Sequence, residues 1–330
     1  MKKKFDIVTI GGATLDIMFA LKKVKLIKSK DSFSSQRWLV FPWGSKIVSQ
    51  DVVYTCGGGA ANTAVSFAKL GLKTAMLSSM GDDHSAQIIL EKLKENKVDI
   101  SLKQKVDNYT ALSFIVTGGS KKEHVIFSHR SANDLLEVSQ NKLKNIKSKW
   151  YYLSSLSGKK WKGNLNIIFA AVKTQGIKIA WNPGSIQLEA GYKNLKKFFP
   201  LCDVLLLNKS EAIQLVATSG IKAKSFNELF KIILGWGCKI VAITQGEKGA
   251  YVCSKEIACF RKSLPIRGIN TTGAGDAFGS SLVGGLMIYK NDLKKALDLA
   301  IIRSSYVVRK IGAQKGLLTL AEIKKLKYKI

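Results

Sequence analysis

The sequence predicts an α/β fold with a doubly wound, mostly parallel sheet flanked by helices and a small β lid. Strand-length apolar runs alternate with amphipathic helical runs from residue 150 onward, as in sheets built from βα units. Two glycine-rich stretches, at 57–59 and 273–275, each open a helix. Extended segments near 21–55 and 108–130 interrupt the alternation. The length of 330 residues and the hydrophobic content of 46% predict one large domain that spans the whole chain.

The net charge and the cysteine content limit which binding partners and which cellular compartment are expected. The chain carries a formal charge of +30, which raises the alternative of a protein that binds nucleic acid or a membrane surface. The excess is nearly all lysine, without an interleaved arginine–aromatic strip, and this favours a solvated surface that attracts anionic nucleotides. No apolar run reaches transmembrane length, and the basic N-terminus lacks a hydrophobic signal core. Five cysteines without a C-x-x-C pair and three scattered histidines indicate neither disulfides nor zinc, so we expect a cytoplasmic protein without nucleic-acid or membrane partners.

The first strand is expected at residues 5–10, an apolar run that ends in two glycines. A parallel strand that ends in this way delivers its next residues to the carboxyl edge of the sheet, where α/β proteins bind ligands. Asp16 is therefore a candidate binding residue. The alternative is an aspartate that only serves a turn.

The two extended segments break the α/β rhythm and are placed outside the main sheet. In the first, residues 37–41 and 46–54 are expected as strands around a Pro-Trp-Gly turn. In the second, residues 111–116 and 124–127 are expected as a hairpin around the turn 118–122. We expect both segments to contribute to one flap.

A helix is expected to follow the glycines at 57–59 and to end near Leu70. Glycines allow a ligand or another backbone to come close. Asn62, in the first turn, is a weak helix former whose amide suits hydroxyl groups. The alternative is a glycine turn followed by an asparagine that only serves the helix start. A strand at 74–80 and another helix follow.

Regular alternation of strands and helices follows from residue 150. The strands are expected at 150–154, 178–181, 204–207 and 240–244, and the helices near 162–174, 188–198, 210–218 and 225–236. Because the carboxyl ends of parallel strands share one edge, polar residues just after them gather into a site.

Polar residues follow the last three of these strands, and Asn182 is the one after the strand at 178–181. Asn208 and Glu211 offer hard oxygen atoms that suit a hydrated Mg²⁺, although the same spacing is that of a helix capping box. Thr244 offers a hydroxyl to a phosphate chain, and Gly246 and Gly249 offer a closely approaching backbone.

The stretch 270–278, Asn-Thr-Thr-Gly-Ala-Gly-Asp-Ala-Phe, is the motif most indicative of chemistry. Gly273, Ala274 and Gly275 place backbone N–H groups at a helix start, where the helix dipole favours anions. Asp276 beside such a site suits the base for a hydroxyl that attacks a phosphate, and the alternative is an Asp-capped helix. The dinucleotide fingerprint needs a strand after its helix, whereas a second helical pattern follows here, and the Walker sequence is absent.

These motifs resemble the ribokinase-like PfkB family of carbohydrate kinases over nearly the whole chain. Residues 57–71 are similar to the early family signature and residues 270–278 to the late one, in the correct order and with Asn208-x-x-Glu211 between them. The resemblance implies ATP-dependent transfer of the γ-phosphoryl group to a sugar-type hydroxyl, with Mg²⁺ as cofactor. The extended segments would form the family's lid over the sugar.

The resemblance also implies roles for the motif residues. Asp276 would take the hydroxyl proton, and the backbone N–H groups of residues 273–275 would stabilise the transferring phosphoryl group. The substrate-binding set would comprise Asp16, Gly58, Asn62 and Arg130. The nucleotide-binding set would comprise Asn208, Thr244, Gly246, Gly249 and Gly312, and the metal set Glu211 and Asn208.

Two departures from the family pattern limit these expectations. The late signature usually begins with Asp and here begins with Asn270, which puts activation by a monovalent cation such as K⁺ in doubt. The first extended segment is longer than in compact relatives, so the substrate and the homodimer through the lid are open. The alternatives are a nucleoside kinase of the same family and a basic nucleic-acid-binding protein on a kinase fold, which the intact Asp276 disfavours.

Overall fold

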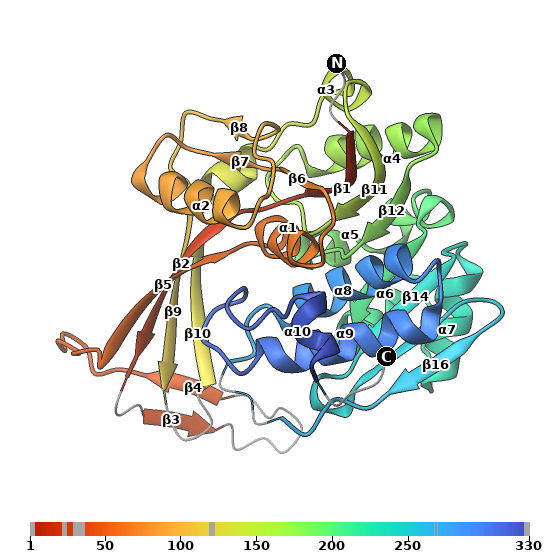
Figure 1. The fold of residues 1–330 in the computed structure, drawn as a ribbon. Coiled ribbons are helices and arrows are strands. Elements are labelled where there is room, and N and C mark those ends of the chain that lie inside the picture. Colours follow the sequence, from red (N-terminus) through yellow and green to blue (C-terminus); the bar gives the residue numbers. More distant parts are fainter. Residues whose placement is uncertain are drawn as a thin grey trace.

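An eight-stranded sheet lies between two layers of helices, and a four-stranded sheet lies beside this body (Figure 1). The structure is a computed structural model that describes residues 4–21, 25–28, 37–118, 123–266, 268 and 270–326. The layered α/β architecture with a smaller second sheet is the one predicted from the sequence.

The large sheet has the strand order β16-β15-β14-β13-β12-β11-β1-β6. Strands from β6 to β14 are parallel, and β15 and β16 add an antiparallel edge that the sequence pattern did not predict. The chain starts at β1 and builds outward on both sides, so the order reverses between β1 and β11, the kind of switch point at which such sheets bind ligands. The strands are β1 (Lys4–Ile10), β6 (Thr74–Leu77), β11 (Lys147–Leu153), β12 (Lys178–Trp181), β13 (Val204–Asn208), β14 (Ile240–Thr244), β15 (Ala250–Cys253) and β16 (Ala258–Arg261).

The central strands are apolar on both faces because helices cover both. In β11, Tyr151 and Leu153 join one core cluster, whereas Trp150 and Tyr152 join the other. Successive side chains of a strand point to opposite faces. Burial on both faces therefore explains why these strands read as continuous apolar runs in the sequence.

One face of the large sheet is covered by α4, α5, α6 and α7, and the other by α1, α8 and α9. The helices are α1 (Gly59–Lys69), α2 (His84–Glu95), α3 (Gln140–Lys144), α4 (Trp161–Gln175), α5 (Ser185–Leu195), α6 (Lys209–Ala217), α7 (Phe226–Gly235), α8 (Ala274–Ile288), α9 (Leu293–Val307) and α10 (Leu320–Lys324). Short elements complete the chain: β7 (Ser79–Met80), β8 (Gln104–Lys105), and 3₁₀ turns η1 (Ser131–Leu135), η2 (Phe199–Leu201) and η3 (Gly246–Lys248).

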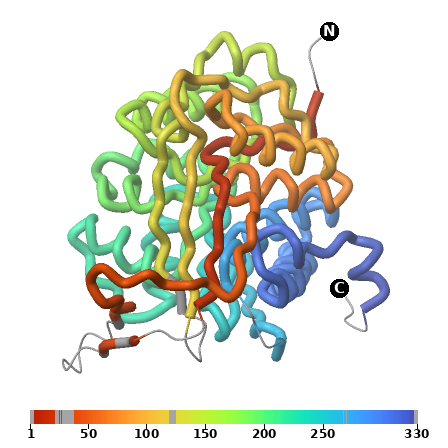
Figure 2. The backbone as a smooth tube through the Cα atoms, turned by 90° about the vertical axis from the view of Figure 1, so that its left-hand side faces the viewer, coloured from red at the N-terminus to blue at the C-terminus, as the bar shows by residue number. Residues whose placement is uncertain are grey.

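The small sheet has the order β10-β9-β2-β5, and Figure 2 shows its four strands side by side. β2 (Thr14–Ala20) runs antiparallel to β5 (Asp51–Gly57) and parallel to β9 (Ala111–Gly118). β9 forms the predicted hairpin with β10 (Glu123–His129). Helix α2 packs against the base of this sheet, where Leu15 and Cys56 share a core cluster with Ile89.

The extended segments differ from the prediction in their pairing. β4 (Arg37–Val40) pairs with β3 (Lys25–Lys28), and β5 pairs with β2, so the two strands expected around the Pro-Trp-Gly turn do not pair with each other. No strand was predicted at β2, which supplies the missing partner. Residues 22–24, 29–36 and the turn residues 119–122 lie outside the described part of the chain.

Candidate functional site

The candidate site lies at the carboxyl ends of the parallel strands, where α1 and α8 both begin. Each helix follows a glycine with a positive φ, 87° at Gly58 and 79° at Gly273. A side chain is strained in this backbone conformation, so the turns favour glycine. The two helices contact each other, and their first turns carry N–H groups without intrahelical partners. An anion placed at this edge would meet both.

The first turn of α8 has the geometry on which the anion-site prediction rests. Gly273 packs so tightly against the segment after α9 that an added Cβ would collide with Ala313. The N–H of Ala274 donates to the carbonyl of Thr271 at 3.2 Å and closes the turn. Beside Gly275, an added Cβ would meet open space. Ala274 therefore serves the turn, while the side of the helix start at Gly275 is open to a ligand.

Asp276, half-buried on this turn, is held by Asn62 of α1. Asn62 Nδ2 donates to Asp276 Oδ2 at 2.8 Å, and Asn62 Oδ1 accepts from Gln314 Nε2 at 3.1 Å. The contact with Gln314 determines which end of the Asn62 amide faces the carboxylate. Burial raises the pKa of Asp276 to about 6, and the hydrogen bond from Asn62 opposes the rise. A carboxyl with this pKa is ionised at neutral pH and is a stronger base than an ordinary aspartate.

Asp16 approaches the same region from the small sheet. It lies in β2 opposite Thr55 of β5 and Ser113 of β9, and only 7% of it is exposed. Burial raises the pKa of Asp16 to about 6; a hydrogen bond with Ser113 lowers that pKa, and the charge of Asp276 raises it. Gly57 makes room for the carboxyl, because a Cβ there would collide with it. The structure thus brings two predicted carboxyl groups together.

Gly58 lies against the turn after β1, where an added Cβ would lie 2.5 Å from the carbonyl oxygen of Gly12. Asn133, which was not predicted, holds the same turn. Its Oδ1 accepts from the N–H of Ala13 at 3.1 Å, and its Nδ2 donates to Thr14 Oγ1 at 3.3 Å. Asn133 lies in η1 directly after the hairpin, and no local motif marks it.

On the other side of the site, Asn208 and Thr244 are paired at the ends of β13 and β14. Asn208 Oδ1 accepts from the N–H of Glu211 at 2.9 Å, and Glu211 Oε2 accepts from the N–H of Asn208 at 2.8 Å. The capping box is therefore present. Burial raises the pKa of Glu211, against the effect of the Asn208 N–H. Each side chain keeps oxygen lone pairs outside the box, as a water-mediated Mg²⁺ site requires.

The two glycines after β14 differ in their surroundings. Gly246 has a φ of 58°, and an added Cβ would meet open space. Gly249 has a φ of 106°, and an added Cβ would collide with the carbonyl of Arg261. Gly246 therefore presents backbone to a ligand, whereas Gly249 is needed for the close approach of β16.

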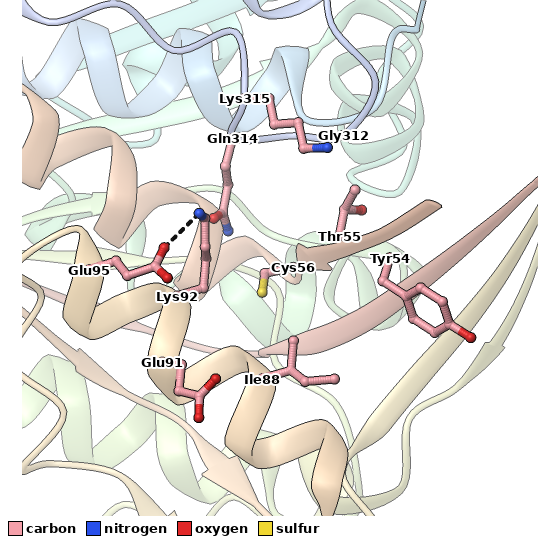
Figure 3. A pocket seen from close by; sticks show the side chains of 10 residues that line it. All are labelled: Tyr54, Thr55, Cys56, Ile88, Glu91, Lys92, Glu95, Gly312, Gln314 and Lys315. Atoms are coloured by element: carbon pink, nitrogen blue, oxygen red, sulfur yellow. Dashed lines mark hydrogen bonds and ion pairs between the residues drawn. The ribbon is translucent and has the colours of Figure 1, made fainter. Parts of the chain in front are cut away.

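Arg130 and Gly312 lie apart from the other predicted residues. Arg130 is exposed after β10, and its side chain has no hydrogen bond or ion pair within the described ranges. Gly312 lies against Thr55, since an added Cβ would be 2.7 Å from Thr55 Cγ2. Gly312 lines a cavity beside the small sheet (Figure 3), not the strand ends that carry Asn208 and Thr244.

A buried arginine that was not predicted connects α9 with the helices of the site. Arg303 is 0% exposed. It donates to Ser66 Oγ and Ser281 Oγ, each at 2.8 Å, to the Ser66 carbonyl at 3.0 Å and to the Leu318 carbonyl at 2.8 Å. Burial lowers the pKa of Arg303 to about 9, so the guanidinium stays charged at neutral pH. Ser66 lies one helical turn after Asn62.

The described residues contain neither a clustered metal site nor a membrane span. Within these ranges no three His, Cys, Asp or Glu side chains come together in a way that would hold a metal ion. None of the helices in the same ranges has the length and apolarity to cross a bilayer. Asn270, where the late signature usually has Asp, accepts from the N–H of Thr272 at 2.7 Å and so supports the turn before α8.

Comparison with known proteins agrees with the fold. Residues 33–320 match the family model described as pfkB family carbohydrate kinase. The chain is 26% identical to an ATP-dependent 6-phosphofructokinase of Thermoanaerobacterium thermosaccharolyticum, over 98% of this chain and 94% of that protein. It is 25% identical to a ribokinase of Haemophilus influenzae, over 84% and 89%.

Two solved structures show the fold to be ribokinase-like. A ribokinase of Arabidopsis thaliana complexed with ribose and ATP superposes with a TM-score of 0.78, at 19% identity over 99% of this chain and 100% of that one. A nucleoside kinase of Burkholderia thailandensis in complex with inosine superposes with a TM-score of 0.75, at 19% identity over 96% of each chain.

Proposed function

Because the chain belongs to the pfkB family of carbohydrate kinases, we propose that it transfers the γ-phosphoryl group of ATP to a hydroxyl of a small sugar. The observation that carries the proposal is the contact of Asn62 with Asp276 at the start of α8. It holds a base beside backbone N–H groups that attract a phosphate.

In this mechanism Asp276 is the general base. The sugar hydroxyl oxygen bonds to the γ-phosphorus while the bond from that phosphorus to the β,γ-bridging oxygen breaks. The leaving ADP keeps the bridging oxygen with its electron pair, and the hydroxyl proton passes to the Asp276 carboxylate. N–H groups at residues 273–275 stabilise the charge on the transferring phosphoryl group, with Gly275 on the open side.

The nucleotide is assigned to the ends of β13 and β14. We assign Thr244 and the open backbone at Gly246 to the phosphates, and Gly249 to the turn behind them. Asn208 and Glu211 would hold Mg²⁺ through water, and the bound ion would neutralise phosphate charge. The Gly312 segment is linked to the nucleotide side of the site through Ala313, which packs on the turn at Gly273. A contact between Gly312 and the nucleobase is therefore the least direct of these assignments.

The inner face of the small sheet favours a sugar over a nucleoside. Asp16 lies on this face, and Phe19 and Phe114 stack on the opposite face with ring centroids 6.2 Å apart. Within the described strands of the small sheet, no Phe, Tyr or Trp shares the face of Asp16 to stack on a base. The neighbours of Asp16 on that face include Thr55, Ser113, Met18 and Ile115. Hydroxyl recognition by Asp16, Asn62 and the backbone at Gly58 suits a small polyhydroxylated acceptor.

The small sheet is assigned the role of a lid that excludes water from the transfer. Its outer face exposes the apolar side chains Val52, Phe114, Val125 and Phe127. Such a patch is typical of a contact surface, and we assign it to a homodimer. Light scattering that finds only monomer at micromolar concentration would remove this assignment.

The function is tested by ADP release from Mg-ATP with neutral pentoses and hexoses, sugar phosphates, keto-sugar acids and nucleosides. We expect strong stimulation by one class of sugar. Sugar phosphates belong in the panel because Arg130 is exposed after β10 and free to meet a second phosphate. Turnover with nucleosides alone would overturn the sugar assignment. Salt-sensitive binding of DNA or RNA, without acceptor-dependent turnover, would instead support the nucleic-acid alternative.

The pair Asp276 and Asp16 predicts an acid limit of activity near pH 6. Burial raises the pKa of both carboxyls to about 6. Protonation removes the base, so kcat/KM is expected to fall about tenfold per pH unit below 6, and more steeply where both groups must be ionised. Asn62→Leu removes the hydrogen bond that lowers the pKa of Asp276, so the limit should move to higher pH. A pH profile that is flat down to pH 5 would contradict this assignment.

A further inference from the structure

A cavity of about 230 Å³ lies at the edge of the small sheet (Figure 3). Three elements line it: β5, α2 and the segment after α9. Among the described strands, β5 is at the edge of its sheet and has β2 as its one partner. None of the lining residues belongs to the carboxyl ends of the main-sheet strands, although Thr55 also borders the face of the small sheet that carries Asp16.

Two enclosed oxygen atoms in the lining have no partner. Gln314 is only 6% exposed, and its Oε1 makes no hydrogen bond. The hydroxyl of Thr55 is likewise enclosed and unpartnered. Figure 3 shows Gln314 reaching from the segment after α9 toward α2 and β5. Buried polar atoms are normally satisfied, so both atoms call for a partner that the protein does not supply.

The charges around the cavity are balanced. Lys92 and Glu95 of α2 form an ion pair at 2.7 Å. Glu91 and Lys315 add one charge of each sign to the lining. The charges of the lining cancel, so they favour the binding of neither an anion nor a cation. A hydroxyl group can instead donate to Gln314 Oε1, and it can donate to or accept from the Thr55 hydroxyl.

We propose that this cavity binds a small neutral polyhydroxylated molecule, a polyol or a sugar, and that its occupancy acts on Asp276 through Gln314 and Asn62. The binding of this molecule does not depend on the proposed function, whereas the effect on Asp276 rests on the proposed function. A free polyol and a second molecule of the acceptor sugar share this chemistry.

The contact chain behind the proposal is continuous. Gln314 Nε2 donates to Asn62 Oδ1 at 3.1 Å, and Asn62 Nδ2 donates to Asp276 Oδ2 at 2.8 Å. The backbone of the Gln314 segment is fixed by Lys69, whose Nζ donates to the carbonyls of Gln314 at 3.4 Å and Leu317 at 3.2 Å. The amide group of Gln314 is the part of this chain that reaches the cavity.

A donor in the cavity would select one orientation of both amides. If Gln314 turned its oxygen toward Asn62, the Asn62 amide would also have to turn, and its oxygen would face the Asp276 carboxylate. That arrangement removes a donor from the carboxylate and adds a lone pair, which disfavours its ionised form. A ligand hydroxyl on Gln314 Oε1 therefore keeps Asp276 ionised. Two other ionisable groups, Asp16 and Tyr152, interact electrostatically with Asp276.

Binding is tested directly with glycerol, erythritol, xylitol and sorbitol, by calorimetry and saturation-transfer NMR without ATP. Ile88→Trp fills the cavity from α2, and Gln87→Trp places the same side chain one residue away on the exposed surface. We expect at least one polyol to bind the parent and Gln87→Trp with equal affinity, and Ile88→Trp to bind at least tenfold more weakly. Thr55→Val, which keeps the shape but removes the hydroxyl, is expected to weaken binding as well and covers the case that Ile88→Trp does not fold.

The effect on Asp276 is tested by the pH profile of turnover with and without the bound polyol. We expect about a twofold gain in rate at pH 5.5, where a shift of half a pKa unit matters, and no change at pH 8. The gain should persist in Gln87→Trp and vanish in Ile88→Trp. A polyol that is not an acceptor separates this site from the acceptor site. Failure of all four polyols to bind, or equal binding to Ile88→Trp, would overturn the site while leaving the kinase assignment intact.

Discussion

Asp276→Asn is expected to lower kcat by at least ~10³-fold while leaving the KM for ATP and the acceptor within a few-fold of the parent values. The amide has the size of the carboxyl and can still accept the hydrogen bond from Asn62. It cannot take a proton from the sugar hydroxyl. The loss therefore falls on the chemical step, and single-turnover measurements of phosphoryl transfer should show it directly.

The same substitution should make the protein more stable at neutral pH. Burial raises the pKa of Asp276 from 3.8 to about 6, so the folded state prefers the neutral carboxyl. Its contribution to stability is full below pH 3.8 and is lost as the pH rises through 6. The melting temperature of Asp276→Asn is therefore expected to exceed that of the parent at pH 7.5 and to approach it near pH 4.

The control for both measurements is Asp82→Asn, which removes an exposed carboxyl that pairs with Lys105 at 2.6 Å. It should change neither kcat nor the melting temperature appreciably. Activity of Asp276→Asn within tenfold of the parent would refute the general-base assignment. A loss of activity with unfolding would point instead to a structural role for the carboxyl.

Arg303→Leu is expected to lower the free energy of unfolding by about 3 kcal/mol or more. The substitution leaves the buried Ser66 carbonyl and the buried hydroxyls of Ser66 and Ser281 without their charged donor, and it also removes the donor of the half-buried Leu318 carbonyl. Each unsatisfied group adds to the loss. Urea unfolding measures the change, and Arg309→Leu is the matched control because Arg309 is exposed and only faces the Tyr306 ring at 5.2 Å.

The network around Arg303 also touches the helices of the site. Ser280 of α8 donates to Ser66 of α1 at 2.6 Å, one helical turn beyond the contact between Asp276 and Asn62. Two side-chain contacts thus join α1 and α8 at successive turns. Equal stability of Arg303→Leu and Arg309→Leu would show that water or repacking satisfies the freed groups and that the network is not needed for the fold.

Local sequence was sufficient for the parallel strands of the main sheet and for the start of α8. Strands buried on both faces read as continuous apolar runs between helical periods, and this pattern depends on near neighbours in the chain. The turn at Gly273 and the position of Asp276 after it likewise depend on the local sequence, because glycine readily adopts the positive φ that this turn requires. Asn208 with Glu211 formed the capping box that their spacing predicted.

The antiparallel strands could not be predicted in the same way. β15 and β16 follow each other at the edge of the sheet, without an intervening helix, so they lack the strand–helix alternation by which the parallel strands were recognised. β2 carries Asp16 on one face and becomes a strand because β5 and β9 pair with it on both sides. Those partners lie 31 or more positions away in the sequence, counted from the pair Ala20 and Asp51.

By itself, the sequence predicted candidate residues for the site; only the tertiary structure decided which of them lie together and how they act on one another. Asn62 and Asp276 meet across 214 positions, and Gln314, which orients Asn62, lies 252 positions away from it. The shared burial of Asp16 and Asp276, which raises the pKa of each, exists only once the small sheet is folded against α1 and α8. Sequence motifs indicate the local backbone conformation, whereas the orientation of these side chains and the pKa of the two carboxyls depend on contacts between segments that are remote in the chain.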